Sequence, residues 1–422
     1  MMRMRNKYAI IIICILALFI IEKENNIILR VSDKLAMFRK QQIPETSSFV
    51  LIDDNSSYPD DIYTENDTHI LRAHEKGQKH ILLMATTRTG SSFVGEFFNQ
   101  QGADMFYLFE PLWHVEVMLS LGTNGTNSST SPWVYRDVLK HLFLCDFSLL
   151  ERFINPPPKN HVTPDLFRRE SSVALCEKQV CTPVIKGIFE KYHCRTRRCG
   201  PLNLTLASEV CQKKRNRVIK TVRVTQLDTL RSLLEDPQLD VRLIQLVRDP
   251  RATLASRIVA FPSKYQDWKS WAVNENVSVK EEEVKRLEGN CNNIRMSAEL
   301  GLSLPKWLEK RYMLVRYEDI ARYPMQKAAE MYNFTGIPFT SQTRDWILKN
   351  THSHSSGIFS TQKNSSEQVE KWRFKIPFKL AQFVQEVCGP TMKLFGYRFV
   401  DNEQSLVNKS FSLLEEKTFH FS

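Results

Sequence analysis

The segment of this chain that looks most like a phosphate-binding loop, residues 81–93, lacks the Gly-x4-Gly-Lys-Ser/Thr pattern of nucleotide triphosphatases. That pattern supplies the lysine and the hydroxyl that hold phosphates and magnesium. A nucleotide-dependent kinase would also need a magnesium-binding carboxylate at this loop, and position 91 is serine. The missing groups argue against ATP as the ligand and against a kinase.

The basic residues lack the interleaved aromatic side chains on which single-stranded nucleic acids stack. The net charge of +11 still favours an acidic partner, because 58 basic residues outnumber 47 acidic ones. We expect no nucleic acid; a sulfated or uronate-bearing glycan fits, and the alternative is that most of these charges are solvated surface groups. The clusters are Arg195, Arg197 and Arg198, then Lys213, Lys214, Arg215, Arg217, Lys220 and Arg223.

The N-terminal apolar run, 9–21, is shorter than the ~20 residues of a typical membrane-spanning helix. No small-x-small cleavage site follows it, so we favour an uncleaved anchor over the alternative, a cleaved signal peptide. Arg3, Arg5 and Lys7 precede the run, and positive flanks stay cytoplasmic. The predicted protein is type II, with a cytoplasmic tail over 1–8, a signal anchor over 9–21, a lumenal stem over 22–78 and a catalytic domain over 79–422.

Triplets of the form Asn-x-Ser/Thr are scattered along the part of the chain predicted to be lumenal. Such triplets are acceptors for N-glycosylation in the secretory pathway, so their scatter favours a lumenal glycoprotein over a cytosolic one. They begin at Asn55, Asn66, Asn124, Asn127, Asn203, Asn276, Asn333, Asn364 and Asn408.

The cysteines favour disulfides. Cys14 lies in the apolar run, and the other cysteines, all predicted to be lumenal, are even in number. Two Cys-x4-Cys pairs within 176–199 also resemble a four-thiolate zinc spacing, but an oxidising lumen favours bridges. We expect them to staple a cysteine-rich insertion over 176–211, with the pairing left open. The lumenal cysteines are Cys145, Cys176, Cys181, Cys194, Cys199, Cys211, Cys291 and Cys388.

An apolar strand is predicted to end in a turn at Gly90 and to pass into a helix. At such a junction the unpaired backbone N–H groups and the positive end of the helix dipole converge, and a bound anion satisfies both. Arg88, Ser91 and Ser92 add side-chain donors. The predicted anion-binding residues are Thr86, Thr87, Arg88, Thr89, Gly90, Ser91 and Ser92.

A second strand-to-helix anion site is predicted after the apolar strand 241–247. Pro250 suits the first helical position. Arg248 stands at the end of the strand and Ser256 lies about two helical turns further on, so a guanidinium and a hydroxyl can share one phosphate. The predicted residues are Arg248, Asp249, Pro250, Arg251, Ala252, Thr253, Leu254, Ala255 and Ser256.

Two anion sites without a loop lysine suit a nucleotide with a 5′ anhydride and a separate 3′-phosphate. They resemble the 5′-phosphosulfate and 3′-phosphate motifs of Golgi carbohydrate sulfotransferases, which use 3′-phosphoadenosine 5′-phosphosulfate (PAPS). Within the galactose/N-acetylglucosamine/N-acetylgalactosamine 6-O family, the chain resembles chondroitin 6-O-sulfotransferase in particular. Supporting runs lie at 94–102, 106–114, 311–319 and 360–368, and the resemblance extends from about residue 79 to the C-terminus.

The resemblance implies transfer of sulfate from PAPS to the 6-hydroxyl of N-acetylgalactosamine in chondroitin, with galactose in keratan sulfate as a second acceptor. The product nucleotide is 3′-phosphoadenosine 5′-phosphate (PAP), and no metal is required. It also implies attachment to the Golgi membrane and leaves a homo-oligomer open. The alternatives are 6-O-sulfation of another glycan and a lumenal glycan-binding protein that has lost catalysis. The presence of Arg88 and Arg248 argues against such a loss.

Predicted strands and helices alternate, which favours an α/β fold with a parallel central sheet and helices on both faces. The resemblance makes this a P-loop-like PAPS-binding sulfotransferase fold. Ligands in such sheets lie at the carboxyl ends of the strands, where both anion motifs begin. Strands are expected at 80–87, 105–109, 217–224, 241–247 and 311–317, and helices at 91–100, 132–153, 226–235, 250–259, 280–300, 324–332 and 376–389.

Glu110 follows the strand 105–109 and is the predicted general base. If that strand neighbours the first one, its carboxylate enters the same crevice as Arg88, which we expect to stabilise the leaving group. The alternative for Glu110 is a cap or an ion pair. His114 is the substitute base, although a lone histidine is more often a packing residue.

Trp372 and Arg373 follow a polar segment and are predicted to contact the nucleotide, Trp372 by stacking on adenine and Arg373 by reaching a phosphate. The alternative is a surface loop followed by a core tryptophan. His352 and His354 are spaced like a ligand pair on a strand, but they lack an obvious carboxylate partner. We interpret them as surface histidines and expect no metal site.

Overall fold

The computed structural model describes residues 77–122, 131–164, 166–181, 199–274, 278–354 and 363–419. All of them belong to one compact unit, Ile70–Ser422. The predicted tail and anchor, and the stem as far as residue 76, lie outside the described residues. Among the helices that are described, none is long and apolar enough to cross a membrane.

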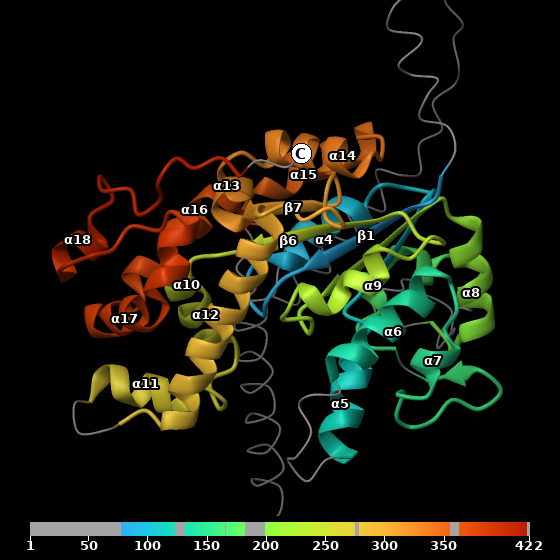
Figure 1. The fold of residues 1–422 in the computed structure, drawn as a ribbon, viewed down its shortest axis with the longest axis horizontal. Coiled ribbons are helices and arrows are strands. Elements are labelled where there is room, and N and C mark those ends of the chain that lie inside the picture. The colour runs from blue at the N-terminus through green and yellow to red at the C-terminus, as the bar shows by residue number, and fades with distance from the viewer. Residues whose placement is uncertain are drawn as a thin grey trace, which may run out of the picture. The chain divides into compact units, whose positions relative to one another are not determined.

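A five-stranded parallel sheet lies at the centre of this unit (Figure 1). All five predicted strands are present, with ends shifted by a few residues at most. Their order in the sheet is β2-β5-β1-β6-β7, so β5 separates β2 from β1. The condition on which the placement of Glu110 near Arg88 depended, that the first two strands are neighbours, is therefore not met. The strands are β1 (Lys79–Met84), β2 (Met105–Phe109), β5 (Asn216–Thr221), β6 (Val241–Val247) and β7 (Tyr312–Arg316).

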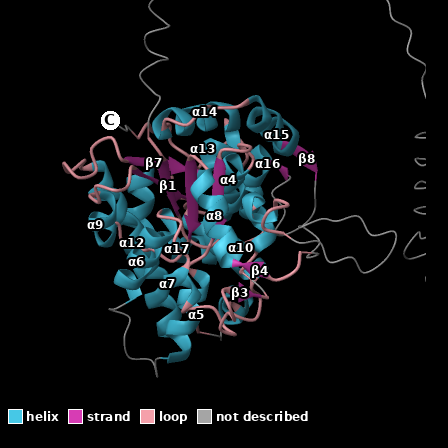
Figure 2. Ribbon diagram, turned by 90° about the vertical axis from the view of Figure 1, so that its right-hand side faces the viewer, coloured by secondary structure: helices cyan, strands magenta, loops and turns pink. Residues whose placement is uncertain are grey.

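Helices cover both faces of the sheet (Figure 2), which confirms the predicted α/β class. One face carries α4 (Ser91–Asn99), α13 (Tyr317–Arg322), α14 (Pro324–Thr335) and α15 (Ser341–Thr351). The other carries α6 (Ser131–Phe143), α7 (Ser148–Glu151), α8 (Leu204–Lys213), α9 (Arg231–Leu234), α10 (Pro250–Ala260), α12 (Glu281–Leu302) and α17 (Phe378–Phe395).

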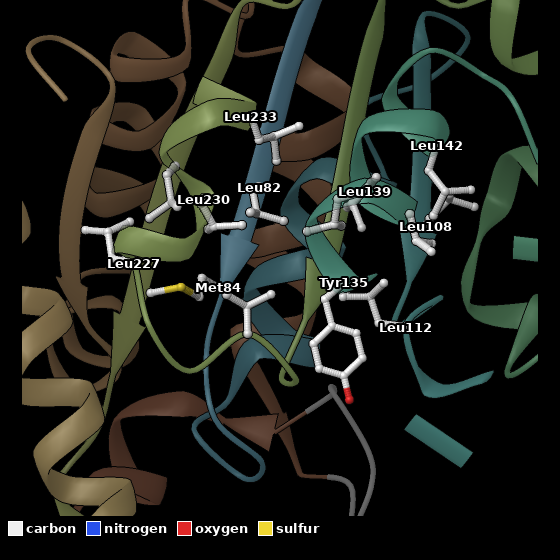
Figure 3. Packing of buried hydrophobic residues seen from close by; sticks show 14 of the residues in the cluster. Leu82, Met84, Leu108, Leu112, Tyr135, Leu139, Leu142, Leu227, Leu230 and Leu233 are labelled. Atoms are coloured by element: carbon white, nitrogen blue, oxygen red, sulfur yellow. The ribbon is translucent and has the colours of Figure 1, made fainter. Parts of the chain in front are cut away.

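Alternate residues of β1 supply two separate cores, because successive side chains of a strand point to opposite faces. Leu82 and Met84 belong to the core beneath α6 and α9, where leucines of these helices meet them (Figure 3). Ile81 and Leu83 belong to the core beneath α4 and α14. A strand that is apolar on both faces is typical of a parallel sheet covered on both sides.

Several elements differ from those predicted. The helical stretch 132–153 is interrupted between α6 and α7, where Cys145 has a φ of 61°. The helix 226–235 is reduced to a 3-10 turn, Asp228–Leu230, followed by α9. The helices that were not predicted are α5 (Trp113–Gly122), α8, α11 (Gln266–Val273), α13, α15, α16 (Ser365–Glu370) and α18 (Glu403–Val407), and α7 was not predicted as a separate helix. The short strands that were not predicted are β3 (Val162–Thr163), β4 (Leu202–Asn203), β8 (His352–His354) and β9 (Lys363–Asn364).

Three disulfides join described residues: Cys145–Cys211, Cys181–Cys199 and Cys291–Cys388. Cys176 is also disulfide-bonded. The predicted use of cysteines in bridges is confirmed, but the bridges are not confined to the insertion 176–211. Cys211 ties it back to the end of α6, and Cys291–Cys388 joins α12 to α17.

Candidate active site

The loop after β1 is shaped by Gly90, which caps α4 with a φ of 97°. A Cβ at this position would lie 2.3 Å from Cδ2 of Tyr317, so both the conformation and the space require glycine. The turn before it is closed by the Thr89 hydroxyl, which donates to the Thr86 carbonyl over 2.6 Å. Since glycine has no capping side chain, the first N–H groups of α4 remain available for an anion.

The loop after β6 is built differently. Asp249 caps α10 by accepting from the Arg251 backbone N–H over 2.9 Å, and Pro250 begins the helix. Arg251 is fully buried, pairs with the Asp249 carboxylate and donates to the Gln385 side-chain oxygen over 2.7 Å. The amino end of α10 is therefore occupied by its own aspartate, unlike the end of α4. The residues Ala252, Thr253, Leu254 and Ala255 are buried.

Arginines join the two loops directly. The Nε of Arg88 donates to the Ser256 hydroxyl over 3.0 Å, and Nη1 of Arg248 donates to the Arg88 carbonyl over 3.0 Å. The guanidinium of Arg248 lies 4.5 Å from the centre of the Tyr317 ring. Its Nε is buried and has no hydrogen-bond partner among the residues that the structure describes. A buried donor of this kind is costly unless a ligand meets it.

Both loops open into one pocket of about 420 Å³. Five cationic side chains line it, against two carboxylates: Arg88, Arg168, Lys220, Arg223 and Arg248, with Glu96 and Glu110. Ser91, Ser92 and Ser256 line it as well. Burial, together with the like charges of Arg248 and Arg168, lowers the pKa of Arg88. An anion bound here would relieve that repulsion.

Glu110 reaches the pocket although its strand is not the neighbour of β1. Its backbone φ is 49°, a left-handed conformation that residues other than glycine rarely adopt. One carboxylate oxygen accepts from the Lys220 ammonium and the other from the Arg223 guanidinium. Burial opposes ionisation of Glu110, but Lys220 and Arg223 outweigh it, so the pKa of Glu110 is lowered.

Lys220 was predicted only as one of a cluster of basic residues, yet its side chain is 1% exposed. Burial lowers its pKa to about 8, although Glu110 acts in the opposite direction. The ammonium lies 4.3 Å from the centre of the Phe109 ring. Arg217 and Lys214 of the same cluster are also buried, whereas Arg195, Arg197 and Arg198 lie outside the described residues. A lysine between apolar strand residues was the signal that could have marked Lys220.

His114 is buried and is not among the residues that line the pocket. Its Nε2 accepts from the Phe167 backbone N–H over 3.0 Å, which uses its lone pair. Burial lowers the pKa of His114 to about 4, so the ring is neutral near pH 7. The histidine fixes the loop that carries Phe167, a role different from that of a base.

Trp372 and Arg373 lie in a 3-10 turn, Lys371–Phe374, and neither lines the pocket. Trp372 is buried with α10, where its ring lies 4.9 Å from the Arg251 guanidinium. Arg373 is 1% exposed and donates to the carbonyls of Leu406, Ser405, Asn408 and Phe411. The structure thus places both side chains in the core, which corrects the expected contacts with a nucleotide.

His352 and His354 lie in β8, and their side chains are outside what the structure describes. Within the described ranges, no group of three or more His, Cys, Asp or Glu side chains is arranged to hold a metal ion.

Comparison with known proteins places this geometry in context. Residues 78–396 match the family described as sulfotransferase domain. The chain is 53% identical to carbohydrate sulfotransferase 3 of Homo sapiens, with 99% of this chain and 95% of the relative covered. It is 50% identical to carbohydrate sulfotransferase 3 of Tetronarce californica, with 99% of each covered. It is 42% identical to carbohydrate sulfotransferase 1 of Homo sapiens, with 81% of this chain and 84% of the relative covered.

Proposed function

This chain belongs to the sulfotransferase domain family, and from that premise we propose that it transfers sulfate from PAPS to the 6-hydroxyl of N-acetylgalactosamine in chondroitin. The observation that carries the proposal is the joined pair of loops, in which Arg88 contacts Ser256 and Arg248 contacts the Arg88 carbonyl. The carbohydrate acceptor is supported by the names of the relatives at 53% and 50% identity. The choice of chondroitin rests on the sequence resemblance.

The residues present fit a donor with two separate phosphate groups. The amino end of α4, which has no side-chain cap, suits the 5′-phosphosulfate together with Ser91, Ser92 and Arg88. Arg248 and Ser256 suit the 3′-phosphate, and the Nε of Arg248, which has no partner within the described residues, supplies a donor for it. PAPS is a substrate that brings the activated sulfuryl group; the protein supplies charge and orientation.

In the proposed reaction, the Glu110 carboxylate accepts the proton of the acceptor hydroxyl. The hydroxyl oxygen forms a bond to sulfur, while the bond between sulfur and the bridging phosphate oxygen breaks. The electron pair of that bond stays on the phosphate of the departing PAP, where Arg88 and the first N–H groups of α4 stabilise the charge. The lowered pKa of Glu110 keeps its carboxylate ionised at neutral pH, which is the state that can accept a proton.

We further propose that the protein is a type II glycoprotein of the Golgi membrane. This placement is supported by the apolar run 9–21 behind basic residues and by the scattered Asn-x-Ser/Thr triplets. The disulfides fit an oxidising lumen.

The test is transfer of radiolabelled sulfate from PAPS by the full-length protein to desulfated chondroitin and desulfated keratan, followed by disaccharide analysis. Label at the 6-position of N-acetylgalactosamine is the expected result. Label on keratan alone would keep the chemistry and change the acceptor. No label on either polymer, despite measurable PAP binding, would overturn the proposal in favour of another glycan or of a binding protein without catalysis.

A further inference from the structure

A second wall of the pocket, formed by residues outside the two donor loops, combines an aromatic face with a cation. The rings of Trp113 and Phe167 are stacked, with centres 4.5 Å apart and planes 9° from parallel. The guanidinium of Arg168 lies 5.6 Å from the Phe167 ring centre and 5.4 Å from that of Phe109. All of these residues line the same pocket as Arg88 and Glu110.

The segment that carries this wall, residues 167–169, is held in place by hydrogen bonds. The buried guanidinium of Arg169 donates to the carbonyls of Leu175, Val180 and Gly200 over 2.9 to 3.0 Å. Phe167 is fixed through its N–H to His114. These contacts hold Arg168 at a φ of 49°, a left-handed conformation that costs energy outside such a frame. A costly conformation held by surrounding contacts is typical of a ligand-binding position.

The same segment is also tied to the elements that build the catalytic centre. The Asn99 amide of α4 donates to the Ser171 carbonyl over 3.1 Å, and its oxygen accepts from the Val173 N–H over 2.9 Å. The Phe109 N–H, one residue before Glu110, donates to the Ser172 hydroxyl over 3.2 Å. The wall therefore has a fixed distance from Glu110, as an acceptor-binding surface requires.

The chemistry of the wall identifies its ligand. Arg168 is exposed at the pocket surface and adds positive charge near Arg88. A guanidinium binds a carboxylate through two parallel hydrogen bonds, and a stacked aromatic face packs against the apolar face of a sugar ring.

We propose that Arg168 binds the carboxylate of a uronate next to the accepting sugar, while the Trp113–Phe167 face receives a sugar ring of the same chain. This inference rests on the proposed function and adds to it the group by which the enzyme distinguishes a uronate polymer from a neutral one. Arg168 is thus a specificity residue, and Glu110 remains the residue that meets the reacting hydroxyl.

The test pairs a protein change with a substrate change. Full-length wild type and Arg168→Gln are assayed on desulfated chondroitin and on the same polymer after its carboxyl groups have been reduced to hydroxyls. One charge-assisted contact corresponds to about a tenfold change in KM. We expect the KM of wild type to be about tenfold higher on the carboxyl-reduced polymer than on chondroitin. Arg168→Gln should have this higher KM on both polymers, and kcat should change little in either protein. Arg398→Gln, at an exposed arginine outside the pocket, is the matched control.

The inference would be overturned if Arg168→Gln raised KM over wild type by the same factor on the carboxyl-reduced polymer as on chondroitin, or if its KM on chondroitin were unchanged. If Arg168→Gln does not fold, Arg168→Lys replaces it, and we expect an intermediate preference because lysine keeps the charge without the paired geometry. If the KM of wild type is the same on chondroitin and on the carboxyl-reduced polymer, the inference is overturned without any variant. A wild type that sulfates neither polymer refutes the proposed function instead, so the two failures are distinguishable.

Discussion

Lys220 of β5 and Glu110, the residue that directly follows β2, are joined by two hydrogen bonds. The Glu110 backbone N–H donates to the Lys220 carbonyl over 2.8 Å, and the Lys220 ammonium donates to the Glu110 carboxylate. The lysine is almost completely buried, and both side chains line the pocket. A buried cation therefore stands directly behind the carboxylate to which we assign the proton transfer.

Glu110→Gln should reduce kcat by about 10²- to 10⁴-fold, the usual contribution of a positioned base, and leave PAP affinity close to that of wild type. Single-turnover sulfate transfer and calorimetric titration with PAP measure the two effects. Because the substitution leaves Lys220 without its carboxylate, it should also lower the melting temperature. The double variant Glu110→Gln/Lys220→Met should recover stability but not activity, which separates the two losses. Near-normal turnover of Glu110→Gln would exclude Glu110 as the base.

Lys220→Met should move the acidic limb of the pH–rate profile to higher pH. In wild type, the cations Lys220 and Arg223 hold the Glu110 pKa low against the effect of burial. Glu110 therefore contributes stability above its ordinary pKa, and that contribution is lost as pH falls through the lowered pKa. Without Lys220 the burial effect is less opposed, so Glu110 is protonated at a higher pH. Lys213→Met, at an exposed position of α8, should leave the limb in place. An unmoved limb in Lys220→Met would show that another group controls it.

The affinity of wild type for PAP should begin to fall as pH rises through about 8, the pKa to which burial lowers Lys220. Below that pH the ammonium is charged and adds to the positive field of the pocket, and above it one cation is lost. Calorimetric titrations between neutral and alkaline pH follow this change. Lys220→Met should bind PAP more weakly than wild type at neutral pH and show no such dependence; the same dependence in the variant would assign it to another residue.

Arg88→Ala should weaken PAP binding by about tenfold to a hundredfold, because it removes a charge-assisted contact to phosphate and the link to Ser256. Turnover should fall with it. The affinity is measured by calorimetry, with Arg398→Ala as the control on an exposed arginine outside the pocket. Normal PAP affinity in Arg88→Ala would remove this residue from the donor site.

Gly90→Ala should destabilise the protein by about 1–3 kcal/mol and weaken PAP binding, because its φ of 97° and the nearby Tyr317 ring leave no place for a Cβ. Gly289→Ala, inside α12 with open space around the added Cβ, should instead stabilise by about 0.5–1 kcal/mol. Chemical denaturation of both variants measures the difference. Equal effects of the two substitutions would contradict the strained geometry assigned to the loop.

The strands and the two loops could be predicted because their signals are local. The run that ends at Gly90 and the run that ends at Arg248 each combine an apolar strand with a turn and a helix start. The order of the strands could not be predicted, since it depends on pairings between distant segments. For that reason the place of β5 between β1 and β2, and with it the contact of Lys220 with Glu110, was missed.

The roles of individual residues within a motif could not be predicted from the local sequence either. Arg248 and Arg251 have the same side chain three positions apart, yet one lines the pocket and the other is buried against Asp249 and Gln385. Trp372 and Arg373 followed a segment that suggested a nucleotide contact, but their partners come from α10 and from residues near α18. Tertiary packing decides such cases, and a single sequence does not encode it in any short pattern.

Trp113, Phe167 and Arg168 belong to a single excursion of the chain, residues 111–215, which begins directly after Glu110 and ends at β5. The loops assigned to the donor follow β1 and β6, which this excursion does not interrupt. The residues assigned to the acceptor and the loops assigned to the donor therefore lie in separate segments of the sequence, which can evolve independently. Recombination or drift within one continuous stretch of gene can rewrite which sugar chain is accepted, while the machinery that delivers sulfate passes unchanged to the descendant enzyme.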